Sequence, residues 1–502
     1  MRNIKKIIPL NRVEGDLRIQ VEIEDGIVRD AYSVGTMYRG IENLMRGRAP
    51  MDSLVITPRI CGICTTAHLN AAAKALDMAY SADVPDNGQR VRNITLMVEQ
   101  LQNDIRHAVL LFMPDLIHPC YANEPLFAEA FSRYQVLKGD TALQTVKETK
   151  KLLEIISILG GQWPHSAFMV PGGVVSVPMA SDIIHCRNIL RNFRKWYEDR
   201  VLGCPLSQWR QIESWDALLV WLDQSPAYRD SDLGFFIRYG LDLGLDTLGR
   251  GHDTFISYGG PDVPNRHRVR PVKGDHLRSA PAFYSPEGLI PLDPDKISED
   301  IACSYFEDDP SIRHPFDGQT IPGDPDTGGK KYSWAKAPRY DGRPAETGAL
   351  ADMLVADQPL FVEQVRSKGA NVLIRELARL VRPINLLLAI DRWLAEMTEC
   401  KSLFFHDYTK AVSARSYGLV PAPRGALGHW VTIENGAIAN YQVITPTAWN
   451  ASPRDSMGIR GPWEEAIVGT EIRDPDHPVE VEQIVRSFDP CLVCTVHALK
   501  VR

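Results

Sequence analysis

Alternation of apolar and polar residues predicts small sheets near both ends of the chain. Residues 17–24 (LRIQVEIE) alternate over eight positions, which is typical of a half-buried strand. Asp25-Gly26 follows directly, and this pair favours a tight hairpin turn, so we expect a second strand beside the first. A similar hairpin signal occurs at residues 431–438 (VTIENGAI).

Helical periodicity dominates the chain between these two signals. Residues 71–80 are rich in alanine with helical spacing, and further helices are expected near 141–158, 180–200 and 361–400, the last interrupted by Pro383. A long helix is also predicted where apolar residues recur at intervals of three and four, at Val91, Ile94, Val98, Leu101, Ile105, Ala108 and Phe112. Several long helices with one apolar stripe are typical of a bundle core.

The segment 259–346 differs from its surroundings. It is dense in Pro, Gly, Asp and Arg without a sustained period, which predicts loops and short strands packed on the core. We therefore expect an α+β fold that is mostly helical, with a long-helix bundle core, small peripheral sheets and long loops. Residues 1–502 are expected to form a single domain, with 259–346 as its loop-rich periphery.

Composition excludes several classes of protein. A formal net charge of −7 and the lack of a basic run argue against nucleic-acid binding. The sequence contains no stretch of about 18 apolar residues, so no membrane span is predicted. The amino terminus lacks the apolar core of a secretory signal, and the cysteines outside two motifs are scattered. We expect a cytoplasmic protein that reaches a membrane only through partners.

Two C-x-x-C motifs carry the candidate chemistry: Cys61 with Cys64, and Cys491 with Cys494. Two such loops facing each other supply four thiolates, a set that suits nickel, zinc or iron and does not suit magnesium or calcium. A structural zinc site usually has its halves about 15–20 residues apart, and a redox dithiol needs only one motif. A four-thiolate metal site is the favoured interpretation, and a zinc-stabilised scaffold is the alternative.

The two motifs, R-x-C-G-x-C-x-x-x-H and D-P-C-x-x-C-x-x-H, resemble the paired signatures of the nickel–iron hydrogenase large subunit. Five further blocks resemble that family in the same order: 9–15 (PLNRVEG), 38–42 (YRGIE), 333–340 (SWAKAPRY), 422–425 (APRG) and 446–450 (PTAWN). The resemblance implies heterolytic oxidation of H₂ to protons and electrons at a nickel–iron centre whose iron carries carbon monoxide and cyanide.

The resemblance also implies which residues hold this centre. All four cysteines of the two motifs would bind nickel, and Cys64 and Cys494 would also bridge to iron. Pro423 and Thr447 would line the cyanides, with Thr447 donating a hydrogen bond. His68 is expected to support the first cysteine loop through hydrogen bonds and not to bind metal.

Acid–base roles follow from the same resemblance. Arg424 would place its guanidinium over the open metal position, oriented by the carboxylates of Asp489 and Asp115. Glu14 would be the first proton acceptor beside Cys494, since a partly buried carboxylate can have a pKa in a useful range.

A second metal site is implied at Glu42, His497 and the backbone carbonyl near Val443. The family usually places magnesium there and sometimes iron. An imidazole ligand fits iron better than magnesium, so both Mg²⁺ and Fe²⁺ stay open.

The chain has no further cysteine cluster with iron–sulfur spacing, so electrons must leave through another subunit. We therefore expect an iron–sulfur small subunit, contacted through residues 160–165, and a higher oligomer of heterodimers. The expected role is the catalytic subunit of an uptake hydrogenase. The alternative is a regulatory H₂-sensing subunit, favoured by Ile63 between the first two ligands and by the five residues after His497. A structural quinone-reductase subunit is disfavoured, since such relatives lack the four cysteines.

Overall fold

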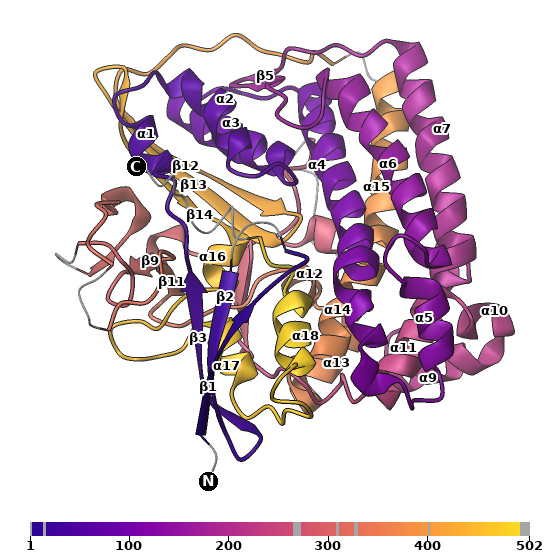
Figure 1. Cartoon of the computed structure of the whole chain (residues 1–502). Coiled ribbons are helices and arrows are strands. Elements are labelled where there is room, and N and C mark those ends of the chain that lie inside the picture. The colour runs from indigo at the N-terminus through magenta and orange to yellow at the C-terminus, as the bar shows by residue number, and fades with distance from the viewer. Residues whose placement is uncertain are drawn as a thin grey trace.

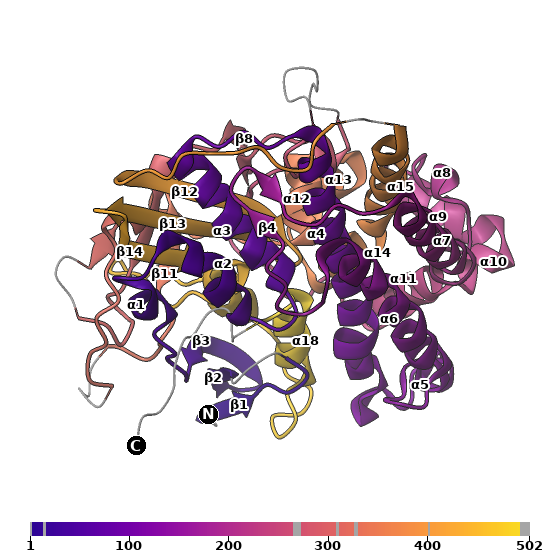
Figure 2. The same ribbon diagram turned by 90° about the horizontal axis from the view of Figure 1, so that it is seen from above.

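Four long helices form a layer along one flank of the molecule: α4 (Asp86–Arg106), α6 (Asp140–Gly160), α7 (Ala180–Trp196) and α15 (Pro383–Glu399). Figure 1 shows them side by side on the right. The computed structural model describes residues 3–13, 17–264, 273–307, 311–325, 330–399 and 402–491. Figure 2 shows this helical layer on one side and most of the sheets on the other.

Shorter helices complete the helical part. They are α1 (Ile41–Met45), α2 (Ser53–Ile56), α3 (Thr65–Tyr80), α5 (Phe127–Tyr134), α8 (Leu206–Trp209), α9 (Trp215–Gln224), α10 (Pro226–Arg229), α11 (Asp232–Asp242), α12 (Ala349–Val355), α13 (Pro359–Lys368), α14 (Val372–Val381), α16 (Pro446–Asn450), α17 (Pro462–Ile467) and α18 (Val479–Ser487).

The strands form small sheets in which every neighbouring pair is antiparallel. One sheet joins β1 (Asn3–Pro9), β2 (Leu17–Glu24) and β3 (Ile27–Gly35), and another joins β12 (Ala414–Ala422), β13 (Gly425–Glu434) and β14 (Ala437–Ile444). The others contain β4 (Met169–Val170), β5 (Gly173–Val174), β6 (Phe255–Ser257), β7 (Ala282–Ser285), β8 (Gly288–Pro291), β9 (Ile297–Asp300), β10 (Ile312–Arg313) and β11 (Ala337–Tyr340).

The predicted mixed fold with a helical core is confirmed. Strand β2 coincides with the alternating segment, and Asp25 and Gly26 both have positive φ, as a tight hairpin turn requires. The 431–438 signal is the β13–β14 hairpin, turned at Asn435-Gly436 with φ of 51° and 76°. Segment 259–346 contains short strands β7 to β11 and loops in its described part.

Two helix predictions need correction. An α-helix was expected to run through Phe112, but α4 ends at Arg106. A π-helical turn, η3 (His107–Phe112), and a 3₁₀ turn, η4 (Met113–Ile117), follow it. The region 361–400 is three helices, α13 to α15, with a break at Gly369 (φ +78°). The interruption predicted at Pro383 is present, since α14 ends at Val381 and α15 begins at Pro383, where a proline in the first turn needs no N–H partner.

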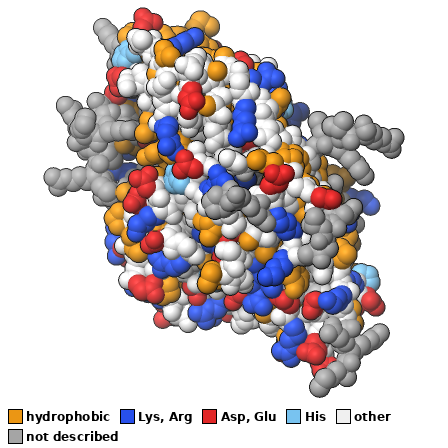
Figure 3. Space-filling view, turned by 90° about the vertical axis from the view of Figure 1, so that its left-hand side faces the viewer, with side chains coloured by type: hydrophobic (Ala, Val, Ile, Leu, Met, Phe, Trp, Pro, Cys, Tyr) orange, Lys and Arg blue, Asp and Glu red, His pale blue; other side chains and the backbone are white. Residues whose placement is uncertain are grey.

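The surface carries charges of both signs. In the face shown in Figure 3, the described acidic and basic side chains are interspersed with small apolar areas and form no continuous basic stripe. Within the described ranges, no helix is long and apolar enough to cross a membrane.

A buried guanidinium joins the core helices. Arg382 has no exposed side-chain area, and its Nη2 and Nη1 donate to Asp104 Oδ1 at 2.6 Å and to Asp352 Oδ2 at 2.7 Å. Arg382→Met leaves both carboxylates buried without their cation, so we expect a loss of about 3–5 kcal/mol of unfolding free energy in urea denaturation followed by circular dichroism. Arg392→Met is the control: this half-exposed side chain lies 3.8 Å from Glu396, and we expect a loss under about 1 kcal/mol. If both variants lost the same free energy of unfolding, Arg382 would not be the buried cation that stabilises the core helices.

Glu464 makes stability depend on pH. Burial raises the pKa of its carboxyl to about 7, although hydrogen bonds from the Ser33 N–H and the Tyr332 hydroxyl lower it. The pKa of Glu464 in the folded protein lies above its unfolded value of 4.5. Its contribution to the free energy of unfolding is therefore complete below pH 4.5 and is lost as the pH rises through 7.

Glu464→Gln removes this titration and keeps an oxygen acceptor. Between pH 4.5 and 8, the free energy of unfolding of the variant should rise by up to about 3 kcal/mol relative to that of the unchanged chain. Thermal unfolding at several pH values provides the measurement. Glu465→Gln, at a partly exposed neighbouring position, should show no such trend. A parallel pH dependence of the Glu464 variant and the unchanged chain would refute the assignment.

Candidate metal centre

Three cysteines from opposite ends of the sequence meet in the interior. The sulfurs of Cys61, Cys64 and Cys491 all lie within 4.8 Å of one another, and the Cys61 and Cys491 sulfurs are 3.4 Å apart. All three side chains are buried. Among the described residues, this is the one group of three or more Cys, His, Asp or Glu side chains close enough to share a metal ion. Cys494, the fourth predicted ligand, lies outside the described residues.

The packing of α3 determines where the first cysteine loop lies. Cys64 is the N-cap residue of α3, so the helix begins directly after the second thiol. Helix α3 packs on β12 and β13, and small residues permit a very close approach. A Cβ at Gly418 of β12 would lie 2.0 Å from the Ala71 carbonyl oxygen, so only glycine fits at this contact.

The second cysteine loop follows α18. Asp489 has φ of +58°, a left-handed conformation that turns the chain between the helix and Cys491. The Cys491 N–H donates to Thr447 Oγ1 at 3.0 Å. Thr447, which was predicted to line the centre, therefore lies against the loop of a thiol ligand.

Arg424 occupies the loop of the β12–β13 hairpin, together with Pro423. Its guanidinium is buried and donates through Nε to Asp489 Oδ1 at 2.9 Å. Burial alone would lower the pKa of Arg424, but Asp489 and the three thiols raise it well above its usual value. A permanent cation thus faces the sulfurs and favours their thiolate form.

Asp489 is the centre of a buried polar cluster. Its Oδ1 lies 3.0 Å from His107 Nδ1, and its Oδ2 accepts a hydrogen bond from Asn103 Nδ2 at 2.6 Å. Burial raises the pKa of the Asp489 carboxyl, but Arg424, His107 and Arg379 outweigh this and hold it far below its usual range. Asn103 and His107 were missed in the sequence, because spacing indicates only their helical face and not their contact with Asp489, which lies 386 and 382 positions later.

The role predicted for Asp115 is wrong. Its carboxylate does not contact Arg424; it pairs with Arg12 and with Arg486, whose Nη1 lies 2.5 Å from Oδ2. The physical reason is local, because the π-helical turn η3 changes the register after α4 and the 3₁₀ turn η4 then directs Asp115 toward Arg486 at the end of α18. Glu14, the predicted proton acceptor, lies outside the described residues.

The predicted second site is partly visible. Val443 N–H donates to Glu42 Oε1 at 2.9 Å, so the structure brings these two residues together, while His497 lies outside the described residues. The sequence did not reveal the buried Lys336, whose Nζ lies 3.3 Å from Glu42 Oε2, 3.4 Å from Glu299 Oε2 and 2.6 Å from Gln442 Oε1. Burial raises the pKa of Glu299 to about 7 despite Lys336.

His68 lies beside the first cysteine loop but outside the thiol cluster. Its Nδ1 is 3.1 Å from His429 Nε2, and His429 Nδ1 is 2.9 Å from the Tyr441 hydroxyl. Burial lowers the pKa of His68 to about 4, so this imidazole is neutral at neutral pH.

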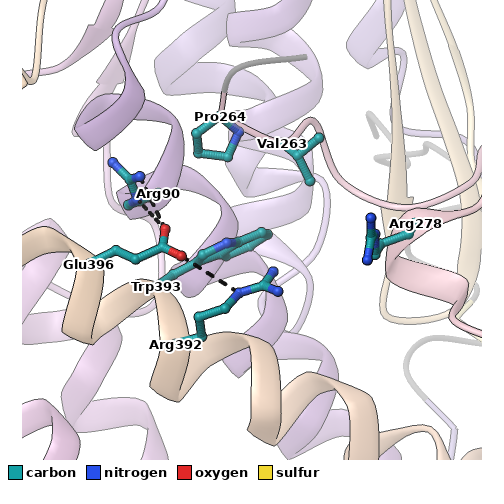
Figure 4. A pocket seen from close by; sticks show the side chains of 7 residues that line it. All are labelled: Arg90, Val263, Pro264, Arg278, Arg392, Trp393 and Glu396. Atoms are coloured by element: carbon teal, nitrogen blue, oxygen red, sulfur yellow. Dashed lines mark hydrogen bonds and ion pairs between the residues drawn. The ribbon is translucent and has the colours of Figure 1, made fainter. Parts of the chain in front are cut away.

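A surface cavity of about 350 Å³ lies between the α4 and α15 ends and is distinct from the thiol cluster. Figure 4 shows Arg90 and Arg392 directed toward Glu396, with Arg278 on the other side. None of its lining residues is a cysteine. This cavity is therefore not the metal centre.

The residues present fit a nickel–iron group. Three buried sulfurs are soft ligands of the kind that nickel and iron accept. Arg424 Nη1 is a buried donor with no hydrogen-bond partner among the described residues, and such an orphaned donor indicates an acceptor outside them, a role that a bound group could fill.

Comparison with known proteins agrees with this chemistry. The family model described as nickel-dependent hydrogenase matches residues 39–125 and 244–497. The chain is 32% identical over 530 aligned residues to the periplasmic [NiFeSe] hydrogenase large subunit of Desulfomicrobium baculatum, covering 98% of this chain and 94% of that protein. It is 27% identical to the uptake hydrogenase large subunit of Rhodobacter capsulatus, covering 99% and 95%.

Solved structures extend the likeness to the whole fold. The reduced Ni-Fe-Se hydrogenase from D. vulgaris Hildenborough superposes with a TM-score of 0.82 at 29% identity, covering 99% of this chain and 100% of that one. With the family model matched over more than half of the sequence, the conclusion is direct: this chain belongs to the nickel-dependent hydrogenase family and is a hydrogenase large subunit.

Proposed function

We propose that this subunit is the catalytic subunit of an uptake hydrogenase, with a nickel–iron centre held by Cys61, Cys64, Cys491 and Cys494. The observation that carries the proposal is the buried cluster of three sulfurs that interacts electrostatically with the Arg424 guanidinium. When bound, the nickel–iron group supplies the redox chemistry that splits H₂ heterolytically into protons and electrons. Relatives named uptake hydrogenase large subunits, which the chain matches over 95% and 94% of their length, support the proposed uptake role.

The protein's own groups prepare the site for that reaction. Arg424 places a cation beside the reacting position, and Asp489 holds it there through a buried 2.9 Å bond. Because the cluster is buried, these charges act with little screening by water. Cys64 and Cys494 would also hold the iron of this group, and Pro423 and Thr447 would line its carbon monoxide and cyanide ligands.

Protons must be passed from the buried sulfurs to solvent. We assign the first proton transfer to Glu14. Arg12, two residues before it in the sequence, forms an ion pair with Asp115. Glu42, the Val443 carbonyl and His497 are the proposed ligands of the second metal, Mg²⁺ or Fe²⁺. Glu42 keeps coordination capacity there, because each carboxylate oxygen has two lone pairs.

An iron–sulfur small subunit is the proposed electron acceptor, in a heterodimer that assembles further. Four strongly exposed apolar side chains support a partner face next to the predicted contact loop 160–165: Val175, Val177, Met179 and Leu403. The two segments that carry them pair through Val174 N–H and the Phe404 carbonyl. Exposed apolar side chains grouped in this way mark protein interfaces.

A charge at this face should prevent assembly. Val177→Asp is expected to lower copurification of the small subunit at least about tenfold, because a carboxylate would be desolvated in the interface. Val220→Asp on α9 is the control, since that side chain is 61% exposed and Val177 is 68% exposed. Small-subunit yield per large subunit is the measurement, and equal yields would place the partner elsewhere.

The function is tested on the chain purified with its natural partner. Nickel and iron in equal amounts, sharp carbonyl and cyanide infrared bands, and sustained reduction of an electron acceptor by H₂ are the expected results. Zinc without such bands would overturn the proposal. Bands with an H₂-dependent change of state but no sustained turnover would indicate the sensory alternative instead. Cell fractionation tests the proposed cytoplasmic location, which differs from that of the periplasmic D. baculatum relative.

A further inference from the structure

Helix α3 begins without a cap of its own. Its N-cap residue is Cys64, whose side chain makes no capping hydrogen bond, and the Cys64 sulfur belongs to the thiol cluster. The first N–H groups of a helix need acceptors, which an Asp, Asn, Ser or Thr usually supplies from the N-cap position. A metal-binding cysteine cannot perform that role, so the acceptor must come from another element.

Glu99 of the neighbouring helix α4 supplies both acceptors. The Thr66 N–H donates to Oε1 at 2.9 Å and the Ala67 N–H donates to Oε2 at 3.0 Å. The indole Nε1 of Trp163 also donates to Oε1, at 3.2 Å. The Glu99 side chain has no exposed area, so no water competes for these oxygens. Helices α3 and α4 are neighbours in Figure 1, which makes this contact possible.

The geometry requires two acceptor oxygens. Each of the second and third N–H groups of α3 points at a different oxygen of Glu99. An amide at this position presents its NH₂ group to one of them in place of a lone pair. The positive end of the helix dipole also favours a carboxylate here.

A second contact ties the same region to the first cysteine loop. His165, two residues after Trp163, lies with Nδ1 3.1 Å from the Pro58 carbonyl oxygen, just before Cys61. The 160–165 loop thus touches the cysteine loop from its amino side and, through Glu99, from its carboxyl side. Cys61 and Cys64 are held between these two contacts.

We propose that Glu99 is a positioning residue of the metal centre, capping α3 from the adjacent helix and thereby directing the Cys64 sulfur into the thiol cluster. It contacts neither metal nor H₂. This role deepens the proposed function and rests on it, since the cluster is taken to hold nickel and iron.

The test uses the purified complex with Glu99→Gln and Glu99→Asp. Glu99→Gln keeps the size and removes one acceptor, so we expect nickel retention or H₂ oxidation to fall about 10- to 100-fold, with shifted carbonyl and cyanide bands. Amide hydrogen exchange of residues 65–69 should accelerate. Glu99→Asp keeps two acceptor oxygens on a shorter side chain and should restore part of the nickel content and of the exchange protection.

Glu464→Gln is the matched control. Glu464 is also fully buried and accepts a backbone N–H bond, from Ser33, but it is not part of the thiol cluster. It should leave nickel content and infrared bands unchanged. If Glu99→Gln likewise changes only thermal stability, the positioning role is overturned. If the unchanged complex itself lacks nickel and iron, the proposed function fails, while unaltered amide exchange at 65–69 in Glu99→Gln would separately reject the capping.

Discussion

Cys491→Ser is expected to abolish both nickel binding and H₂ oxidation, with a loss of activity greater than about 100-fold. Cys491 has no exposed area, and its sulfur lies 3.4 Å from that of Cys61, so the substitution removes one soft ligand from the centre of the cluster. A serine hydroxyl stays protonated at neutral pH and is a hard ligand, unsuited to nickel. Elemental analysis of nickel and iron per chain, together with an H₂ oxidation assay, provides the measurement.

Cys186→Ser is the matched control for this loss. Cys186 is also fully buried, on α7, and burial raises the pKa of its thiol to about 12, so it is an inert core residue. The control should retain nickel and turnover. A Cys491→Ser chain that folds by circular dichroism and still carries stoichiometric nickel would show that the cluster is not the metal centre.

Arg424→Lys should lower kcat by about 100-fold while nickel and iron are retained. Lysine keeps the charge but loses the planar fork, which binds Asp489 through Nε and leaves Nη1 without a hydrogen-bond partner among the described residues. The expected signature is a reduced kcat with metal content unchanged, since the thiol ligands are untouched. Steady-state H₂ oxidation on metal-quantified samples separates the two quantities.

Arg339→Lys is the control for a buried arginine in an ion pair. Its guanidinium is 3% exposed and bonds Asp455 at 2.8 Å, on β11 and outside the thiol cluster. It should lower stability without lowering kcat. If both lysine variants reduced turnover equally per bound nickel, the effect would come from the fold and not from a charge beside the reacting position.

Local elements were predictable because their causes lie within a few residues. The strand at 17–24 follows from strict alternation, and the turns at Asp25-Gly26 and Asn435-Gly436 follow from residues that accept positive φ. The boundary of the helix after Arg106 was not predictable from apolar spacing, because a π-helical turn preserves the apolar run while changing its register. That change is why Asp115 pairs with Arg12 and Arg486.

The candidate site likewise has parts that local sequence predicts and parts that depend on contacts between distant segments. The thiol pair of the first motif and the Pro423-Arg424 turn are local: the pair was found by its spacing, and the turn by its resemblance to the family's block. The partners that tune them come from distant segments: Asn103 and His107 on Asp489, and Lys336 beside Glu42. Nothing in the sequence around Glu99 indicates that its carboxylate caps another helix, because that contact depends on how α3 and α4 pack.

The sequence by itself determined the ligand chemistry, two small hairpins, the long helices and the family resemblance, since these depend on residue type and short-range periodicity. Only the tertiary structure decided that Cys61 and Cys491, 430 residues apart, lie with their sulfurs 3.4 Å from each other. It also decided which buried carboxylate holds Arg424. Contacts over such separations are determined by packing of the whole core and by the need to pair every buried charge, and neither can be read from a local pattern.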